Sequence, residues 1–306
     1  MRLGEDKVRS AASRQHVAVM VDEVTALVRA PNPLVIVDAT VGLGGHAAAL
    51  LEATDAHLLG LDRDAAALEA AAANLARFGA RVTLRQADFR AFDEVLDECG
   101  IPCVGAVLAD LGMSSFALDD PARGFSFRFD GPLDMRMDRR EPVSAYDIVN
   151  EEPEEELARI LRDYGEERGA RRIARAIVAA RRRRPLETTG DLRSLIEAVG
   201  GRARVGGINP STRVFQALRI AVNRELESLA ALLERAPRRL AAGGRIVILA
   251  YHSLEDRPVK RRFREFARGG GFPLATRKAM RPAAAEVAQN SRARSARLRC
   301  LERSAP

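Results

Sequence analysis

The sequence predicts an α/β fold in which a parallel sheet carries an inserted, all-helical unit. Short apolar runs alternate with helical segments from residue 34 to residue 110, the pattern of βαβ units. The alternation stops between residues 115 and 205, where helical spacing replaces it, and a further strand-like run follows at residues 245–250. With 306 residues, the chain is long enough for two domains of ordinary size.

The first part of the chain supplies four strands and the helices between them. The first of these, at residues 34–38, is a short run rich in β-branched side chains, as expected of a strand buried on both faces. The strands are expected at residues 34–38, 58–62, 81–86 and 104–110. Helices are expected directly after the glycines near residue 45, and at residues 64–78 and 91–98.

The second part of the chain begins with residues 112–150, which are rich in Gly, Pro, Asp, Phe and Met and are expected to form an ordered loop. Apolar residues at helical spacing then predict helices at residues 154–184, 191–199 and 211–240. A fifth strand is expected at residues 245–250, with weaker strands near 274–278 and 296–301. We therefore expect a discontinuous sheet domain over 1–114 and 206–306, and an inserted helical domain over 115–205.

Composition indicates a folded protein of the cytoplasm. Hydrophobic residues make up 47% of the chain and charged residues 30%, which excludes a disordered protein. No apolar run approaches the roughly 20 residues of a membrane-spanning helix, and the polar N-terminus lacks the apolar stretch of a secretory signal. Cys99, Cys103 and Cys300 lack the spacing of a zinc site, so we expect reduced thiols and no metal.

Positive charge gathers at the C-terminus. Residues 257–306 hold fourteen Lys or Arg and three Asp or Glu, whereas the whole chain has a net charge of +7. A basic segment on a mildly acidic body suggests a polyanionic partner that docks at one place. The alternative is a solvated, arginine-rich surface without a specific partner.

All four early strands end in an aspartate, namely Asp38, Asp62, Asp88 and Asp110. Ligands of open parallel sheets bind beyond the carboxyl ends of the strands. Four carboxylates at one edge favour a cationic ligand with hydroxyls, which fits S-adenosylmethionine. A dinucleotide would share the glycines at 42, 44 and 45, but it would bring a pyrophosphate to these acids. Asp38 could instead cap a turn.

Further predictions concern residues near these strand ends. Asp62 would hold the ribose hydroxyls of this ligand, and Asp88-Phe89 would meet the edge and the face of its adenine. Asp64 is expected to be a helix N-cap rather than a ligand.

Several strings of the chain resemble those of a known family. They are His16 to Glu23, VGLGGH at 41–46, DLGMSS at 110–115, RGFSF at 123–127, DGPLDMRMD at 130–138, YGEER at 164–168, NPSTR at 209–213 and HSLEDR at 252–257. This spaced set resembles the RsmH (MraW) family of bacterial methyltransferases, from about residue 16 to the end. The chain departs from it at Phe116-Ala117, where many members have Pro-Gln, and in a shorter basic insertion before the C-terminus.

The resemblance implies a Rossmann-like, S-adenosylmethionine-dependent methyltransferase fold with an inserted helical domain. The implied reaction is N4-methylation of a specific cytidine in the decoding centre, at the P site, of small-subunit 16S ribosomal RNA. The implied partner is that RNA within the small ribosomal subunit, and neither DNA nor a membrane is expected as a partner. The protein itself is expected to be a monomer or a homodimer. The cofactor contacts of the family fall on Gly44, Gly45, His46, Asp62, Phe89 and Asp110.

Asp110 is also the candidate catalytic residue. The lone pair of cytosine N4 is delocalised, so the enzyme must align N4 with the methyl carbon and accept a proton from it. Asp110 would face N4 directly or through water, although it could bind the cofactor alone. The base must be unstacked and read by aromatic and polar groups.

The candidates for reading the base are Phe125, Phe127, Tyr251 and His252, although the two phenylalanines could equally anchor the loop. Candidates for phosphate contacts are Arg136, Arg139, Arg261, Arg262 and Arg264. The run Arg181–Arg184 is expected to be a solvated helix end.

Two other functions are compatible with these residues. A methyltransferase that acts on a small amine would share the cofactor site, but it would not need the basic segment or the long insertion. A non-catalytic RNA-binding assembly factor would retain a vestigial pocket, whereas the acids and glycines here are intact. Cofactor affinity measured together with turnover on small subunits separates the three functions.

Overall fold

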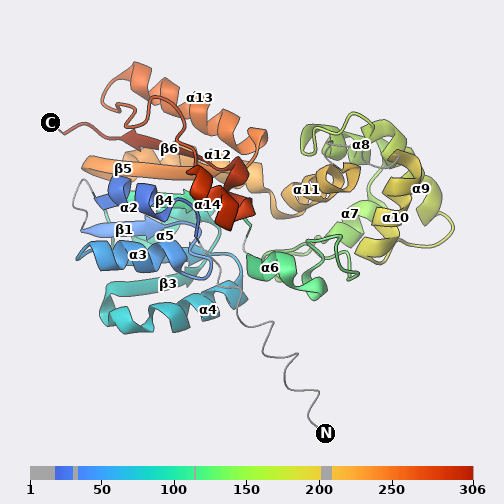
Figure 1. The fold of residues 1–306 in the computed structure, drawn as a ribbon, viewed down its shortest axis with the longest axis horizontal. Helices are drawn as coiled ribbons and strands as arrows, with labels where there is room; N and C mark the ends of the chain where they lie inside the picture. Colours follow the sequence, from blue (N-terminus) through green and yellow to red (C-terminus); the bar gives the residue numbers. More distant parts are fainter. Residues whose placement is uncertain (1–17, 30–33, 114, 201–208, 306) are drawn as a thin grey trace, which may run out of the picture.

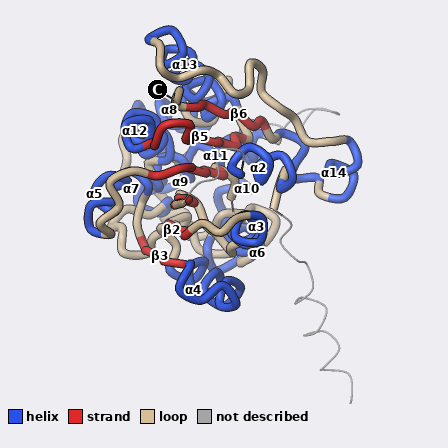
Figure 2. The backbone as a smooth tube through the Cα atoms, turned by 90° about the vertical axis from the view of Figure 1, so that its left-hand side faces the viewer, coloured by secondary structure: helices blue, strands red, loops and turns tan. Residues whose placement is uncertain are grey.

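The computed structural model describes residues 18–29, 34–113, 115–200 and 209–305. Its centre is one six-stranded sheet with the strand order β3-β2-β1-β4-β5-β6, seen edge-on in Figure 2. The first five strands are parallel, as predicted, and β6 pairs with β5 in the antiparallel direction. The strands are β1 (Val35–Asp38), β2 (His57–Asp62), β3 (Val82–Gln86), β4 (Val104–Asp110), β5 (Leu240–Ala250) and β6 (Arg297–Glu302).

Helices cover both faces of the sheet because its strands are apolar on both sides. Ile36 packs with the helices of one face, whereas its neighbour Val37 packs with those of the other. The first face carries α2 (Val21–Arg29), α3 (Gly45–Ala53) and α4 (Ala65–Leu75). The second face carries α5 (Phe92–Glu98), α12 (Glu225–Arg239) and α13 (Ser253–Gly269). The predicted Rossmann-like architecture of three layers is therefore confirmed.

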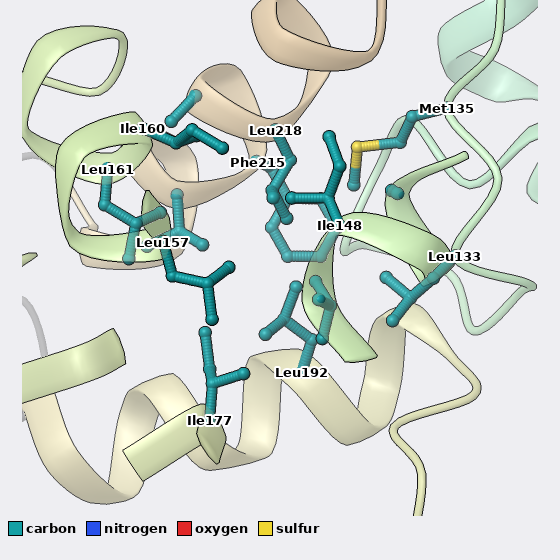
Figure 3. Close-up of a cluster of buried hydrophobic side chains, with 14 of the residues drawn as sticks. Leu133, Met135, Ile148, Leu157, Ile160, Leu161, Ile177, Leu192, Phe215 and Leu218 are labelled. Carbon is teal, nitrogen blue, oxygen red and sulfur yellow. The ribbon is translucent and has the colours of Figure 1, made fainter. Parts of the chain in front are cut away.

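A separate apolar core lies among the helices between β4 and α12, beside the sheet in Figure 1. Figure 3 shows Leu157, Ile177, Leu192 and Phe215 of this core pointing toward one another. Its helices are α7 (Ala145–Glu151), α8 (Glu154–Asp163), α9 (Ala170–Arg181), α10 (Thr189–Gly200) and α11 (Pro210–Asn223). The division at residues 115 and 205 stays a prediction, and α11, which follows the second boundary, contributes Phe215 to the helical core.

Two predicted long helices are each broken by a residue with a left-handed backbone. The predicted helix 154–184 divides into α8 and α9 near Glu166 (φ 49°), and 211–240 divides into α11 and α12 at Arg224 (φ 49°). At the first break, a Cβ on Gly165 would lie 2.7 Å from the carbonyl oxygen of Arg213. The break therefore lets α8 approach α11 closely.

Short elements also differ from the predictions. The expected loop at 112–150 contains α6 (Ser115–Asp119), the single turn η3 (Pro121–Arg123) and α7. The prediction of a strand at 274–278 is wrong, because only an isolated bridge between Leu274 and Leu301 forms there. The strand expected at 296–301 is confirmed as β6. The remaining elements are η1 (Ala76–Arg81), η2 (Phe89–Ala91), α14 (Ala284–Gln289) and η4 (Ser291–Ser295). Among the described residues, no helix is long and apolar enough to cross a membrane.

Candidate active site

A cavity of about 890 Å³ opens at the carboxyl ends of the parallel strands. The end of β1 and the following glycine loop contribute one side, the ends of β2 and β4 contribute the acids, and the segment after β5 closes the opposite side. The predicted contacts Gly45, His46, Asp62, Phe89 and Asp110 all line this cavity, whereas Gly44 is not among the described residues that do. The cavity therefore lies where ligands of such sheets bind.

The glycine loop is shaped by backbone geometry. Gly42 (φ 51°) and Gly44 (φ 83°) both have left-handed backbones, which glycine adopts at little cost. Gly44 is the N-cap of α3, and a Cβ there would lie 3.1 Å from the side chain of Leu75. A Cβ on Gly45 would lie 3.1 Å from that of Ala18. Close packing of the protein on itself therefore contributes to the need for these glycines, in addition to the predicted approach of a ligand.

Asp62 is held at the end of β2 by backbone donors. Its two carboxylate oxygens accept the N–H groups of Gly42 (2.9 Å) and Asp64 (2.9 Å). Burial raises the pKa of Asp62 despite these hydrogen bonds. A buried carboxylate that lines a cavity is stabilised by a cation or by hydroxyl donors. The geometry fits the predicted contact with ribose hydroxyls.

Asp88 and Asp38 are both hydrogen-bonded to other groups of the protein. Asp88 lies 2.8 Å from Nη2 of Arg63, and its carboxylate accepts a hydrogen bond from Ser228 (2.9 Å). Asp88 is not among the described residues that line the cavity, so the predicted contact of its side chain with the adenine edge is not supported. Its neighbour Phe89 does line the cavity, with Arg63 over its ring.

Asp38 is almost completely buried at the end of β1, with 1% of its surface exposed, and its carboxylate accepts the N–H of Thr40 (3.1 Å). Burial raises the pKa of Asp38 to about 7, and the charges of Asp110 and Asp62 add to the effect of burial. His46 and the Thr40 N–H act in the opposite direction. Asp38 thus caps a turn, which was the alternative left open for it.

The raised pKa of Asp38 predicts a pH-dependent stability. The protein without cofactor should lose stability as the pH rises from about 4 through about 7, because the fold favours the neutral acid. Asp38→Asn should remove this loss and raise the Tm at pH 8, by ~2–4 °C for each kcal/mol regained. Calorimetry of both proteins at pH 5 and pH 8 measures the change in Tm. An equal pH dependence of Tm in the two proteins would contradict the prediction.

Asp110 ends β4 between a histidine and a tyrosine. Its Oδ2 lies 3.7 Å from Nδ1 of His46, and Nε2 of His46 lies 2.8 Å from the carbonyl oxygen of Val19. The hydroxyl of Tyr251 is hydrogen-bonded to the Asp110 carboxylate, and Oδ1 accepts the N–H of Gly112 (3.2 Å). Burial raises the pKa of Tyr251, and the Asp110 charge raises it further, so the phenol stays neutral as a donor. Asp110 is thus fixed as a carboxylate facing the cavity.

A cluster that sequence reasoning mostly missed lines the same cavity. Both oxygens of Glu225 bind the guanidinium of Arg219 at 2.8 Å. Burial disfavours the charge of Arg219, but the carboxylates of Glu225 and Glu255 outweigh it and raise the pKa of Arg219. His252 lies beside them, with Nε2 3.1 Å from Oε1 of Glu255. Glu225, His252 and Glu255 are close enough together to hold a metal ion, but Arg219 already supplies a positive charge beside the two carboxylates.

Only part of this cluster left a signal in the sequence. The HSLEDR string singled out His252, and the spacing of His252 and Glu255 resembles a capping box at the start of α13. Arg219 and Glu225 lie on either side of the break between α11 and α12. Because that break was not predicted, nothing in the sequence indicated that the two side chains meet.

Other predicted candidates have structural roles. Phe125 is buried in the helical core, and Phe127 packs edge-on against Phe215 with ring centres 5.3 Å apart. Arg136 is paired with Asp134 at 2.8 Å, so the predicted phosphate contact is not supported.

The remaining motif residues divide between scaffold and surface. Asp64 caps α4, as predicted, and it also pairs with the buried Arg123 at 2.8 Å. Arg139 is exposed. In the run 181–184, Arg181 donates to the carbonyl oxygens of Val149 and Glu152. The other three arginines are exposed at the end of α9, so the predicted solvated helix end holds except at Arg181.

The residues at the cavity fit S-adenosylmethionine. Asp62 and Asp110 are carboxylates without an Arg or Lys ion-pair partner among the described residues. A ligand with a sulfonium and an ammonium supplies the missing positive charge, and Phe89 provides an apolar surface for an adenine.

Comparisons with known proteins identify the family of this chain. The model of the MraW methylase family matches residues 13–304. A protein of Sorangium cellulosum named Ribosomal RNA small subunit methyltransferase H is 48% identical, over 94% of this chain and 91% of its own length. One of the same name from Acidothermus cellulolyticus is 50% identical, over 94% and 93%. The solved structure of an rRNA methylase from Streptococcus thermophilus is more distant, with 12% identity and a TM-score of 0.42 over 93% of each chain.

The family match confirms the resemblance found in the sequence motifs, all of which lie within the matched residues. It also confirms the predicted class of enzyme, a methyltransferase with S-adenosylmethionine as its methyl donor. The chain belongs to the MraW methylase family.

Proposed function

We propose that this protein methylates the exocyclic N4 of one specific cytidine in the decoding centre, at the P site, of 16S ribosomal RNA. One observation carries this proposal: relatives named Ribosomal RNA small subunit methyltransferase H are 48–50% identical over 94% of the chain. The substrate is the RNA of the small ribosomal subunit, and the activity belongs to the cytoplasm, where subunits are assembled. The proposal includes the cofactor contacts assigned above to Gly44, Gly45, His46, Asp62, Phe89 and Asp110.

The side chains of the cavity divide the work of the reaction. The bound cofactor supplies an electrophilic methyl group. Asp62 and the glycine loop hold the ribose side of that ligand, and Phe89 contacts its adenine. Asp110 faces N4 and accepts a hydrogen bond from it, which orients the nitrogen lone pair toward the methyl carbon. The Tyr251 hydroxyl and the Gly112 N–H keep the Asp110 carboxylate in place for this task.

Methyl transfer by the purified protein tests the proposal against its two alternatives. We expect label from radioactive S-adenosylmethionine to enter the RNA of purified small subunits. Transfer to small amines but not to RNA would favour the small-amine enzyme. Binding of the subunit without any transfer would favour the assembly factor. Ribosomal RNA from a strain that lacks the protein should in turn lack the modification.

The basic C-terminal segment supports an RNA substrate. Half of its fourteen basic side chains are exposed and have no ion-pair or hydrogen-bond partner within the described part of the chain. These are Lys260, Arg264, Arg268, Arg277, Lys278, Arg281 and Arg294. Three arginines of this segment were predicted to touch phosphates, and Arg264 is among these seven. Arg261 lies 3.8 Å from Glu265, and Arg262 is paired with Glu234 and lies over the ring of Phe266. The seven free cations of this segment, which we call the basic surface, are available for RNA phosphates.

Salt dependence tests this basic surface. Charge reversal of Lys260, Arg264 and Arg268 should make the slope of log affinity for RNA against log salt concentration shallower by about 2. Each contact with a single-stranded phosphate contributes ~0.7 to that slope. Cofactor affinity should stay unchanged, because none of the three lines the cavity. A matched control reverses three exposed arginines of the helical unit, Arg171, Arg182 and Arg183. If both triple variants weaken RNA binding equally, net charge alone explains the effect.

A further inference from the structure

His252 stands out because its half-buried imidazole lines the cavity and has no hydrogen-bond partner among the residues that the structure describes. Its side chain is 17% exposed, it lines the cavity, and neither ring nitrogen has a hydrogen-bond partner in the described residues. Buried polar atoms in folded proteins are almost always satisfied. An imidazole that faces a substrate cavity in this state is free to bind a group of the substrate.

A fixed carboxylate lies beside the ring of His252. Nε2 lies 3.1 Å from Oε1 of Glu255, an ion-pair contact once the ring is protonated, although its angle is not that of a hydrogen bond. The other oxygen of Glu255 accepts the N–H of Tyr251 (2.7 Å) and of His252 (3.3 Å), so this carboxylate cannot swing away. Arg219, Glu225 and Glu255 together carry one net negative charge.

We propose that His252 is a second catalytic residue, which takes the proton that cytosine N4 loses during methyl transfer. This assignment rests on the proposed function. It modifies the interpretation of Asp110, to which the sequence alone had given that proton. An exocyclic amine has two N–H groups, so one is available to Asp110 as a hydrogen-bond donor and the other to His252.

The proposed step is balanced in atoms and charge. N4 forms a bond to the methyl carbon as the bond from that carbon to sulfur breaks, and the positive charge passes from sulfur to nitrogen. One N4 proton then moves to a ring nitrogen of His252, which leaves a neutral methylated base and a neutral thioether. Glu255 stabilises the resulting imidazolium, with Glu225, Arg219, Tyr251 and Asp110 as the other titratable groups around it.

Two substitutions of His252 separate proton transfer from a structural role. His252→Gln keeps a hydrogen-bonding side chain that cannot take a proton, so turnover on small subunits should fall by ~10²-fold or more. The KM for the subunit and the cofactor affinity, measured by calorimetry, should not change. His252→Ala should regain turnover when imidazole is added, but not with the much weaker base 1,2,4-triazole. As a control, His57→Gln changes an exposed histidine at the start of β2 and should have no effect.

The outcomes distinguish this inference from the function on which it rests. Loss of turnover in His252→Gln with intact cofactor binding, together with rescue by imidazole, supports the assignment. Full turnover of His252→Gln beside an active wild type overturns the assignment alone. Loss of turnover without imidazole rescue also overturns it, because it indicates a structural role. A wild type that transfers no methyl group to the subunit overturns the proposed function, and the role of His252 with it.

Discussion

Asp110→Asn should reduce turnover on small subunits by ~10²–10³-fold, the loss typical when an oriented electrostatic contact to the reacting group is removed. Asn has the shape of Asp and can still accept hydrogen bonds from Tyr251 and Gly112, so the site should keep its geometry. The neutral amide, however, no longer stabilises the positive charge that develops on N4 during methyl transfer. The substitution therefore acts mainly on the transition state.

The comparison of turnover with cofactor affinity decides the role of Asp110. We expect cofactor affinity to fall much less than turnover, as measured by titration calorimetry and by single-turnover methyl transfer. Equal losses in both would show that Asp110 binds the cofactor only. Asp119→Asn is a control at an acid that also lines the cavity but pairs with Arg292 at its rim.

Asp62→Ala should weaken S-adenosylmethionine binding by ~10- to 150-fold, or ~1.5–3 kcal/mol, because a buried acceptor of ribose hydroxyls is lost. The substitution also removes the acceptor of the Gly42 and Asp64 N–H groups, which loosens the glycine loop. Asp62→Asn keeps one acceptor oxygen, so its loss should be smaller.

A control and a contrary outcome complete this test. Asp55 is exposed before the start of β2, at the other end of that strand from Asp62, and Asp55→Ala should bind the cofactor normally. Unchanged binding by Asp62→Ala in titration calorimetry would remove Asp62 from the cofactor site.

The sheet and its edge of acids were predictable because their signal is local. Buried parallel strands are short apolar runs, and an aspartate stands at or just after the end of each of the first four, where the parallel arrangement must bring them to one edge. The helix breaks at Glu166 and Arg224 depend instead on distant contacts. Gly165 approaches the backbone of Arg213, 48 positions away, and such proximity leaves no trace in helical periodicity.

The division of the candidate residues between site and scaffold could not be predicted for the same reason. Phe127 was a candidate for stacking on a base, but Phe215 from α11 covers it. Asp88 follows the end of β3 and was grouped with Asp62, yet Arg63 and Ser228 occupy its carboxylate. The type of a side chain indicates what chemistry it can perform. Its neighbours in the fold determine whether it is free to perform it.

The central claim is methyl transfer to N4 of one cytidine of small-subunit RNA, and isotope labelling tests it most directly. Purified small subunits are incubated with the protein and with S-adenosylmethionine that carries a deuterated methyl group, and the RNA is then digested and analysed by tandem mass spectrometry. We predict a single labelled cytidine, with the methyl group on its exocyclic nitrogen, in a fragment of the decoding centre. Label on a ring carbon, on another nucleotide or on no RNA at all would contradict the account.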